Sequence, residues 1–275
     1  MELLQKLDKN VRSSPPRTFY IKDEIERFVC QELCVRPTGA FQKCDAPTNT
    51  FRFAAKFCYQ LLNNYSPDLF QQLTEDPYKW AKRFPKEVCV VTSNFRPRGN
   101  FADHKIRGTN YEQDALAVYC QHQCVSVLRR MEVINPTMPF LISGADGAVF
   151  ADGEFKRIVE IKVPKVARVK GNIRHLLETN QICHDVFMDD DGLQVRGETK
   201  FQMQLSMLIY NVDECDLLMY SPVDASLYVK RFYLDPEFEE ENLSKIFLHY
   251  RVYIPFVYHY MLAEKKQREE EPMEM

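Results

Sequence analysis

A stretch in the middle of the chain, SGADGAVFADGEFKRIVEIKVP (residues 143–164), carries acidic and basic residues at a spacing that could serve metal chemistry. Alternate side chains of a β-strand share one face. If RIVEIKV is a strand, Glu160 and Lys162 lie on one face and Val159 and Ile161 on the other. An isolated Glu-x-Lys pattern is more often a solvated strand face than a catalytic one, so its interpretation depends on the surrounding residues.

An aspartate between two glycines, Asp146, precedes this strand. The dipeptide Asp152-Gly153 separates two β-prone segments, and such a dipeptide favours a hairpin because both turn positions take positive φ. The hairpin lays GADGAVF beside RIVEIKV, which brings Asp146 close to Glu160. Two neighbouring carboxylates repel each other and raise a pKa unless a cation lies between them, and such oxygen ligands suit Mg²⁺ or Mn²⁺. A lysine beside them is a poor ligand, but it could hold a metal-bound water molecule and a phosphate oxygen.

The formal net charge of −3 argues weakly against a nucleic-acid partner, but the basic residues are unevenly distributed. Two basic runs lie in the sequence on either side of the acidic pair. Residues 82–107 contain seven basic residues and two acids, and residues 161–177 contain five basic residues and no acid. Exposed charges more than about 10 Å apart are largely screened, so a polyanion responds to the local field. Either run alone is most simply a solvated loop, but two runs around a carboxylate pair favour a phosphate-binding groove.

The first part of the chain, up to about residue 93, is predicted to be mostly helical, with breaks at Pro15-Pro16, Pro37 and Pro67. FRFAAKFCYQLLNNY (residues 51–65) has helical spacing of apolar residues, and SPDLFQQL (66–73) begins with a serine cap and a proline. KEVCVVTSNF (86–95) is a short β-prone segment.

The part after residue 100 mixes strands with helices. GTNYEQDALAVYCQHQCVSVL is predicted to be a helix with Thr109 or Asn110 as its cap, and KFQMQLSMLIYNV an amphipathic helix. ICHDVFMDDDGLQVRG is predicted to be a hairpin that turns at Asp191-Gly192. FLISG, GAVF, RIVEIKV, CDLLMYSP and SLYVKRFYL are predicted strands, and a helix follows Asp235 and breaks near Pro255. These elements predict one α/β sheet packed by helices.

The composition bounds the class of protein. With 275 residues, 45% hydrophobic and 27% charged, the chain suits one large domain or one core with an appended subdomain. No apolar run is long enough to span a bilayer and the N-terminal residues lack the apolar segment of a signal peptide, so we expect a soluble, intracellular protein with no membrane contact. The nine scattered cysteines are expected to be reduced core residues rather than disulfides or a zinc site.

Asp146…Glu160-Ile161-Lys162 resembles the D…(D/E)-x-K signature of the restriction-endonuclease-like nucleases, the PD-(D/E)XK superfamily. The ordered segments RGTNYEQDALAVY, SGADGAVF, VEIKVP and FQMQLSML resemble the phage lambda exonucleases, the YqaJ-type viral recombinases and the viral alkaline exonucleases. The resemblance covers roughly residues 101–260. It implies an α/β fold with a central mixed β-sheet flanked by helices. The expected organisation is a mainly helical N-terminal region (1–100), a nuclease core (101–265) and an acidic tail (266–275).

The resemblance also implies roles for residues of the site. Asp146, Glu160 and the Ile161 carbonyl oxygen match metal ligands, and Glu112 matches an acid that completes a second metal site, which implies two Mg²⁺ or Mn²⁺ ions. Lys162 matches the residue that orients or deprotonates the attacking water. Without the resemblance, Glu112 is most simply an acid that favours a helix N-terminus.

Gln202 and Gln204 match a Gln-x-Gln pattern of which one glutamine positions the nucleophile or the scissile phosphate. Residues two apart on a helix do not share a face, so only one is expected to reach the site, and Gln204 is favoured.

Basic and hydroxyl residues are the candidates for contact with DNA. Relatives often hold a terminal 5′ phosphate with a W…R…(I/V)TAS element, and the nearest stretch here contains Trp80, Arg83, Thr92 and Ser93, with extra residues and without the alanine. These residues have a purely structural alternative, with Trp80 in the core and Arg83 at the surface. Four further candidates come from the basic runs and the helix before the acidic pair: Arg107, Lys165, Arg168 and Lys170.

The resemblance implies a metal-dependent DNA nuclease, most simply a 5′-to-3′ exonuclease that acts on linear double-stranded DNA in recombination or viral DNA processing and leaves 5′ phosphates. An endonuclease or RNA-cleaving relative, and a catalytically silent nucleic-acid-binding subunit, are the alternatives. Relatives imply a single-strand annealing or binding protein as partner and a location in the nucleus or at sites of viral DNA replication. The sequence leaves the oligomeric state and the polarity of degradation open.

Overall fold

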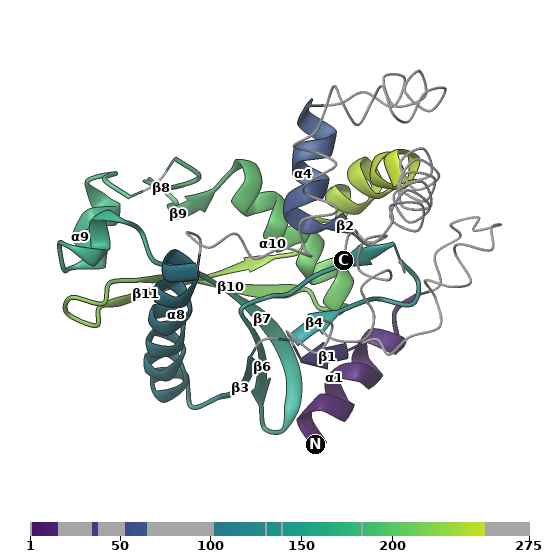
Figure 1. The fold of residues 1–275 in the computed structure, drawn as a ribbon, viewed down its shortest axis with the longest axis horizontal. Helices are drawn as coiled ribbons and strands as arrows, with labels where there is room; N and C mark the ends of the chain where they lie inside the picture. Colours follow the sequence, from purple (N-terminus) through teal and green to yellow (C-terminus); the bar gives the residue numbers. More distant parts are fainter. Residues whose placement is uncertain are drawn as a thin grey trace, which may run out of the picture.

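The computed structural model describes most of the chain after residue 102 and three short pieces before it (Figure 1). The described residues are 2–15, 35–37, 53–64, 102–129, 131–138, 140–182 and 184–250. Several predictions fall outside them: the helix at 66–73, the strand at 86–95, the break near Pro255, and the candidate residues Trp80, Arg83, Thr92 and Ser93.

A five-stranded mixed sheet forms the centre of the molecule, with the strand order β11-β10-β7-β6-β3. Its members are β3 (Ser126–Arg129), β6 (Gly147–Ala151), β7 (Glu154–Lys162), β10 (Glu214–Tyr220) and β11 (Leu227–Tyr233). β7 and β10 pair in parallel and the other neighbours pair antiparallel. The predicted fold class, a central mixed sheet flanked by helices, is confirmed.

The hairpin that carries the acidic pair forms as predicted. β6 and β7 pair antiparallel, and Asp152 and Gly153 take positive φ angles of 52° and 76° at the turn. Gly147 lies opposite Val159, so the residue before β6, Asp146, meets β7 beside Glu160. Sequence alternation and turn chemistry together therefore set this register.

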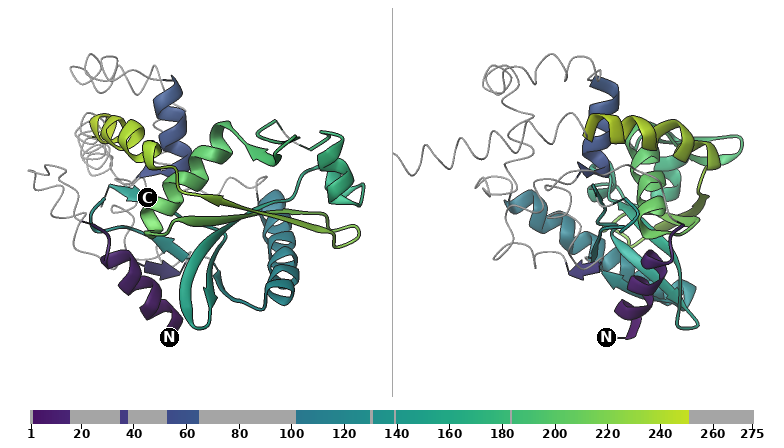
Figure 2. Two further views of the ribbon diagram at one scale, coloured as in Figure 1. Left: turned by 180° about the vertical axis from the view of Figure 1, so that it is seen from behind. Right: turned by 90° about the vertical axis from the view of Figure 1, so that its right-hand side faces the viewer.

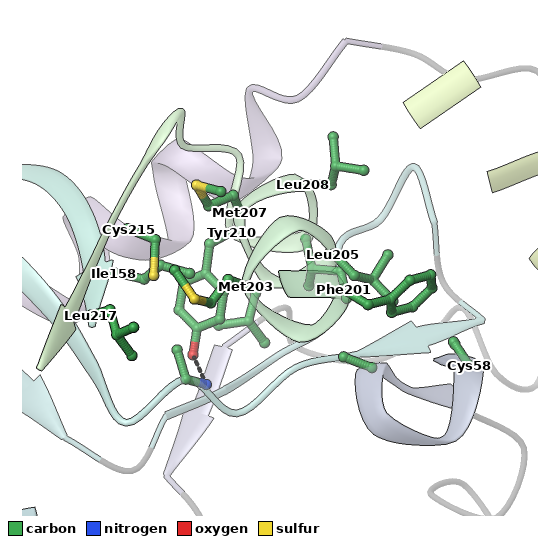
Figure 3. Close-up of a cluster of buried hydrophobic side chains, with 14 of the residues drawn as sticks. Cys58, Ile158, Phe201, Met203, Leu205, Met207, Leu208, Tyr210, Cys215 and Leu217 are labelled. Carbon is green, nitrogen blue, oxygen red and sulfur yellow. Dashed lines mark hydrogen bonds between the residues drawn. The ribbon is translucent and has the colours of Figure 1, made fainter. Parts of the chain in front are cut away.

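Two helices cover the two faces of the sheet (Figures 1 and 2). α8 (Ala102–Gln123) packs an apolar stripe against the face that bears Val159 and Ile161. α10 (Gly197–Tyr210) packs against the opposite face, where its side chains contact Ile158 (Figure 3). β7 is thus a central strand that is buried on both faces.

The remaining elements surround this core. They are α1 (Glu2–Arg12), β1 (Val35–Pro37), β2 (Phe53–Ala54), α4 (Ala55–Asn64), β4 (Met131–Val133), β5 (Leu141–Ile142), the 3₁₀ helix η3 (Val166–Arg168), α9 (Ile173–Glu178), β8 (Val186–Asp189) and β9 (Gly192–Val195). Residues 236–250 are also helical. Asp235 caps this last helix as predicted, because its Oδ1 accepts a hydrogen bond from the Glu237 N–H.

The described part of the first hundred residues joins the same core. α1 and α4 are helical, whereas β1 pairs with β4 and β2 pairs with β5. Leu7 and Val11 of α1 lie in one hydrophobic cluster with residues of the central sheet. The described N-terminal pieces therefore pack as part of the core rather than as a separate unit.

Two expectations for the helix α8 are wrong. The helix begins at Ala102, so Thr109 and Asn110 are internal residues and not caps. It also ends at Gln123, because Cys124 takes a positive φ of 53° and the chain then continues as β3. β-branched residues in VSVLR favour that strand over a further turn of helix.

Two smaller differences concern the second hairpin and α10. The turn between β8 and β9 consists of residues 190 and 191, and the positive φ falls on Gly192 in β9. α10 is not amphipathic, because nearly all its residues from Thr199 to Tyr210 are buried between the sheet, α4 and the last helix.

Among the described residues, no helix is both long enough and apolar enough to cross a membrane.

Candidate active site

Asp146 lies at the point where β6 begins and β7 continues beyond it. Its Oδ2 accepts a hydrogen bond of 2.7 Å from the Ile161 N–H. The carboxylate thus takes the place of a ladder partner that β6 no longer supplies. The N–H and C=O of one strand residue point to the same side, so the Ile161 carbonyl oxygen also faces Asp146.

Glu160 and Lys162 lie side by side on the face of β7 that α10 covers. Lys162 Nζ donates to Glu160 Oε1 at 2.7 Å, and the Glu160 side chain is only 9% exposed, against 29% for Lys162. The predicted proximity of Asp146 to Glu160 is confirmed. A buried carboxylate of this kind is costly unless it is paired, and Lys162 supplies the pair.

Glu112 approaches the same point from α8. Burial raises the pKa of Asp146 well above its usual range, and the negative charges of Glu160 and Glu112 raise it further. The Ile161 N–H and the charge of Lys162 lower this pKa but do not offset the other effects. Asp146 is therefore close enough to Glu160 of β7 and to Glu112 of α8 to be repelled by both charges.

The fit of this cluster to a divalent ion has two sides. Repulsion among buried carboxylates is what a cation relieves, and carboxylate oxygens with a backbone carbonyl are the donors that Mg²⁺ and Mn²⁺ prefer. Within the described ranges, however, no group of three Asp, Glu, His or Cys side chains is gathered as a formed metal site. Lys162 pairs with Oε1 of Glu160, so an ion that binds this oxygen competes with the ammonium.

The two glutamines of α10 differ from the expectation. Gln204 is buried, and its amide bridges two backbone groups: Nε2 donates to the Tyr233 carbonyl and Oε1 accepts from the Asp235 N–H. Gln204 therefore connects the end of β11 to α10. Because its amide is used in this way, it is not free to position the nucleophile or the scissile phosphate, which was the expected role. Gln202 is half-buried and lies one turn before Ser206, which contacts the segment leading to Asp146. Gln202 is the better candidate for the site.

The basic candidates after Lys162 are not equivalent. Lys165 and Lys170 are exposed, and Lys170 Nζ also reaches Gln181 Oε1 at 3.3 Å. Arg168 is half-buried, donates two hydrogen bonds to the Val163 carbonyl and lies over the ring of Tyr111, so it fixes the loop against α8. Arg107 lies within α8, and its side chain is outside the described part.

A buried polar network on the α8 side of the sheet was not predicted. Asp216 of β10 accepts hydrogen bonds from the Tyr119 hydroxyl, from Arg157 and from Arg231, at 2.6, 2.6 and 2.8 Å. The sequence did not signal this network, because Arg157 directly follows Lys156 and Asp216 lies two residues after Glu214, so neither stands out as a lone charge in its strand. Such charges remain buried only when they are paired.

The sequence matches no family model and no curated protein. Among solved structures, the chain is similar to the alkaline exonuclease LHK-Exo from Laribacter hongkongensis, with a TM-score of 0.52 and 18% identity over 79% of this chain and 95% of that chain. A second structure of LHK-Exo, in complex with dAMP, gives the same values. A phage-related exonuclease from Haemophilus somnus 129PT is 10% identical over 76% of this chain and 96% of that chain, with a TM-score of 0.44. The chain therefore has the fold of the alkaline exonuclease LHK-Exo, which is the fold that the sequence pattern predicted.

Proposed function

We propose that the protein is a metal-dependent deoxyribonuclease, and specifically a 5′-to-3′ exonuclease that degrades linear double-stranded DNA and leaves 5′ phosphates. The proposal is supported by the contact of the Asp146 carboxylate with the Ile161 N–H, next to the Glu160–Lys162 pair, with Glu112 of α8 near enough for its charge to raise the pKa of Asp146. This arrangement occurs within the fold of an exonuclease. The dAMP in one LHK-Exo structure is a mononucleotide of the kind that stepwise DNA cleavage releases.

In this proposal the carboxylates of Asp146, Glu160 and Glu112 and the Ile161 carbonyl hold Mg²⁺ or Mn²⁺. When bound, two such ions supply an activated water and neutralise charge on the scissile phosphate. The Lys162 ammonium, which pairs with Glu160 in this structure, would orient the attacking water or contact a phosphate oxygen. Gln202 orients the same phosphate from α10.

The loop after Lys162 supplies the proposed grip on DNA. Lys165 and Lys170 are exposed on this loop, while Arg168 holds the loop in place through the Val163 carbonyl. Exposed lysines contact phosphates without reading bases, so we expect little sequence preference and strong salt dependence. Degradation of one strand exposes the other, so a single-strand annealing protein is a fitting partner.

The test is a digestion with Mg²⁺ of four substrates: linear duplex with 5′ phosphates, linear duplex with 5′ hydroxyls, closed circular duplex, and RNA. The proposal predicts release of 5′ mononucleotides from linear DNA, no cleavage of the circle, and no activity in Asp146→Ala. Cleavage of the circle or of RNA would replace the substrate assignment with an endonuclease or ribonuclease. Equal digestion by Asp146→Ala and the parent would refute the nuclease site itself.

A further inference from the structure

Two hydroxyl groups of α10 hold the segment that leads into Asp146. Ser206 Oγ lies 2.8 Å from Ser143 Oγ. The Tyr210 hydroxyl accepts a hydrogen bond from the Ala145 N–H at 3.2 Å and donates one to the Met131 carbonyl at 2.7 Å. Figure 3 shows the bond to Ala145, with the Tyr210 ring packed beside Met203 and Ile158.

The spacing of these two residues suits this task. Ser206 and Tyr210 are four apart, so they lie on one face of the helix. They bond to residues 143 and 145, which are alternate positions of an extended segment. Both residues are buried, with exposures of 4% and 0%, so their hydroxyls depend on these partners because a buried hydroxyl without a partner is costly.

The other side of the segment is held by β4. Ser143 exchanges two backbone hydrogen bonds with Val133, at 2.7 and 3.0 Å. The Tyr210 hydroxyl bonds to Met131 in the same strand. It therefore connects α10 both to β4 and to the segment 143–145 that precedes Asp146. We call the hydrogen bonds of Ser206 and Tyr210 to residues 143 and 145 the clamp. Directly after it, the Asp146 carboxylate extends to the Ile161 N–H.

We propose that Tyr210 and Ser206 are positioning residues, which hold Asp146 where its carboxylate can bind the divalent ion while touching neither ion nor DNA themselves. This inference rests on the proposed function for the identity of the ligand. The two hydroxyls hold the Ala145 backbone and the Ser143 side chain, one and three residues before Asp146, and the backbone of this segment sets the direction of the carboxylate. Groups that orient a metal ligand without touching the metal typically change metal affinity or activity by about 10–100-fold.

The test compares Tyr210→Phe with Tyr119→Phe. Both tyrosines are fully buried, and each hydroxyl donates one hydrogen bond and accepts one, but Tyr119 lies on the opposite face of the sheet. Ser206→Ala is compared with Ser14→Ala, another buried serine with hydrogen-bonded partners. Two quantities are measured in each variant: Mn²⁺ affinity by calorimetry, and hydrogen–deuterium exchange of the peptide that contains Ile161 in metal-free protein.

Tyr210→Phe is expected to weaken Mn²⁺ binding by about tenfold and to accelerate exchange at Ile161. Tyr119→Phe is expected to leave the Mn²⁺ affinity and the exchange at Ile161 close to the parent values, even if it lowers the melting temperature as much as Tyr210→Phe does. Equal Mn²⁺ affinity and equal exchange in Tyr210→Phe and Tyr119→Phe would overturn the proposal. If Tyr210→Phe does not fold, the pair Ser206→Ala and Ser14→Ala decides by the same criteria. If the parent cleaves no DNA, the proposed function fails, and the exchange comparison still judges the clamp.

Discussion

At the residue scale, the ion pair between Lys162 and Glu160 has a consequence for catalysis. The ammonium that is proposed to act on the nucleophile also occupies an oxygen that is proposed to bind the ion, at 2.7 Å. Ion binding and release of Lys162 are therefore expected to be coupled. The alternation of a strand predicted the shared face of these two residues, but it did not predict that they pair with each other.

Replacement of Lys162 by alanine separates these two roles. We expect Lys162→Ala to reduce DNA cleavage about 100-fold or more, which is the usual scale for loss of a group that handles a proton or orients the nucleophile. Mn²⁺ affinity is expected to stay equal or to rise, because the competing ammonium is removed. Calorimetry and single-turnover cleavage measure the two effects, with Lys156→Ala on the exposed start of β7 as control. A Lys162→Ala protein that loses Mn²⁺ binding would contradict this coupling.

The two glutamines give a second prediction. Gln202→Ala is expected to lower the cleavage rate with little change in stability. Gln204→Ala removes the side-chain partner of the Tyr233 carbonyl and of the Asp235 N–H, and the loss of each such hydrogen bond costs about 0.5–1.5 kcal/mol. We therefore expect a lower free energy of unfolding and a near-normal rate per folded molecule. The reverse pattern, measured by urea denaturation and single-turnover kinetics, would restore Gln204 to the site.

At the element scale, a buried polar network joins one helix and three strands on the α8 face of the sheet, opposite the face that α10 covers. Asp216 of β10 accepts hydrogen bonds from Tyr119 of α8, Arg157 of β7 and Arg231 of β11. The hairpin β6–β7 was predictable because Asp152-Gly153 gives a strong local turn signal. The start of α8 and the strand β3 were not, because Thr109 and Asn110 are good caps in isolation, whereas the helix begins at Ala102.

The Asp216 network predicts a dependence of stability on pH. Burial raises the pKa of Asp216, but the hydrogen bonds from Arg231 and Tyr119 and the charge of Arg157 outweigh burial, and the pKa is lowered. A carboxyl group whose pKa is lower in the folded state stabilises the protein fully above its unfolded pKa of about 4, and this contribution is lost as the pH falls through the folded pKa. Asp216→Asn is expected to lose about 3–5 kcal/mol at pH 7 and to lack this acid-induced loss. Urea denaturation from pH 7 to pH 3 measures both, and an unchanged pH profile in Asp216→Asn would contradict the assignment.

The loop between β7 and α9 carries a prediction about DNA affinity. Its position is set by the turn between β10 and β11, since Ser221 Oγ donates to the Ala167 carbonyl and Asp224 accepts from the Asn172 N–H. If Lys165 and Lys170 contact phosphates, Lys165→Ala with Lys170→Ala lowers the slope of log affinity against log salt by about two. Binding is measured in Ca²⁺ to prevent cleavage, with Lys156→Ala as control. An unchanged slope would place the DNA elsewhere.

At the scale of the whole molecule, the site depends on segments that are far apart in sequence. Asp146 and Glu160 are joined by a local hairpin, so a sequence pattern could predict their meeting. Glu112 comes near Asp146 only because α8 packs across the sheet. Tyr210 contacts the segment before Asp146 only because α10 packs on the other face. These long-range contacts have no local signal, and for Glu112 the resemblance to known nucleases supplied what the spacing could not.

The central claim is that Glu112, Asp146 and Glu160 form the site of a divalent ion. A calorimetric titration of the parent and of Asp146→Ala with Mn²⁺ at neutral pH tests it most directly. The account predicts saturable binding to the parent and loss of that binding in folded Asp146→Ala. Absence of Mn²⁺ binding by the parent, or unchanged binding by Asp146→Ala, would contradict it.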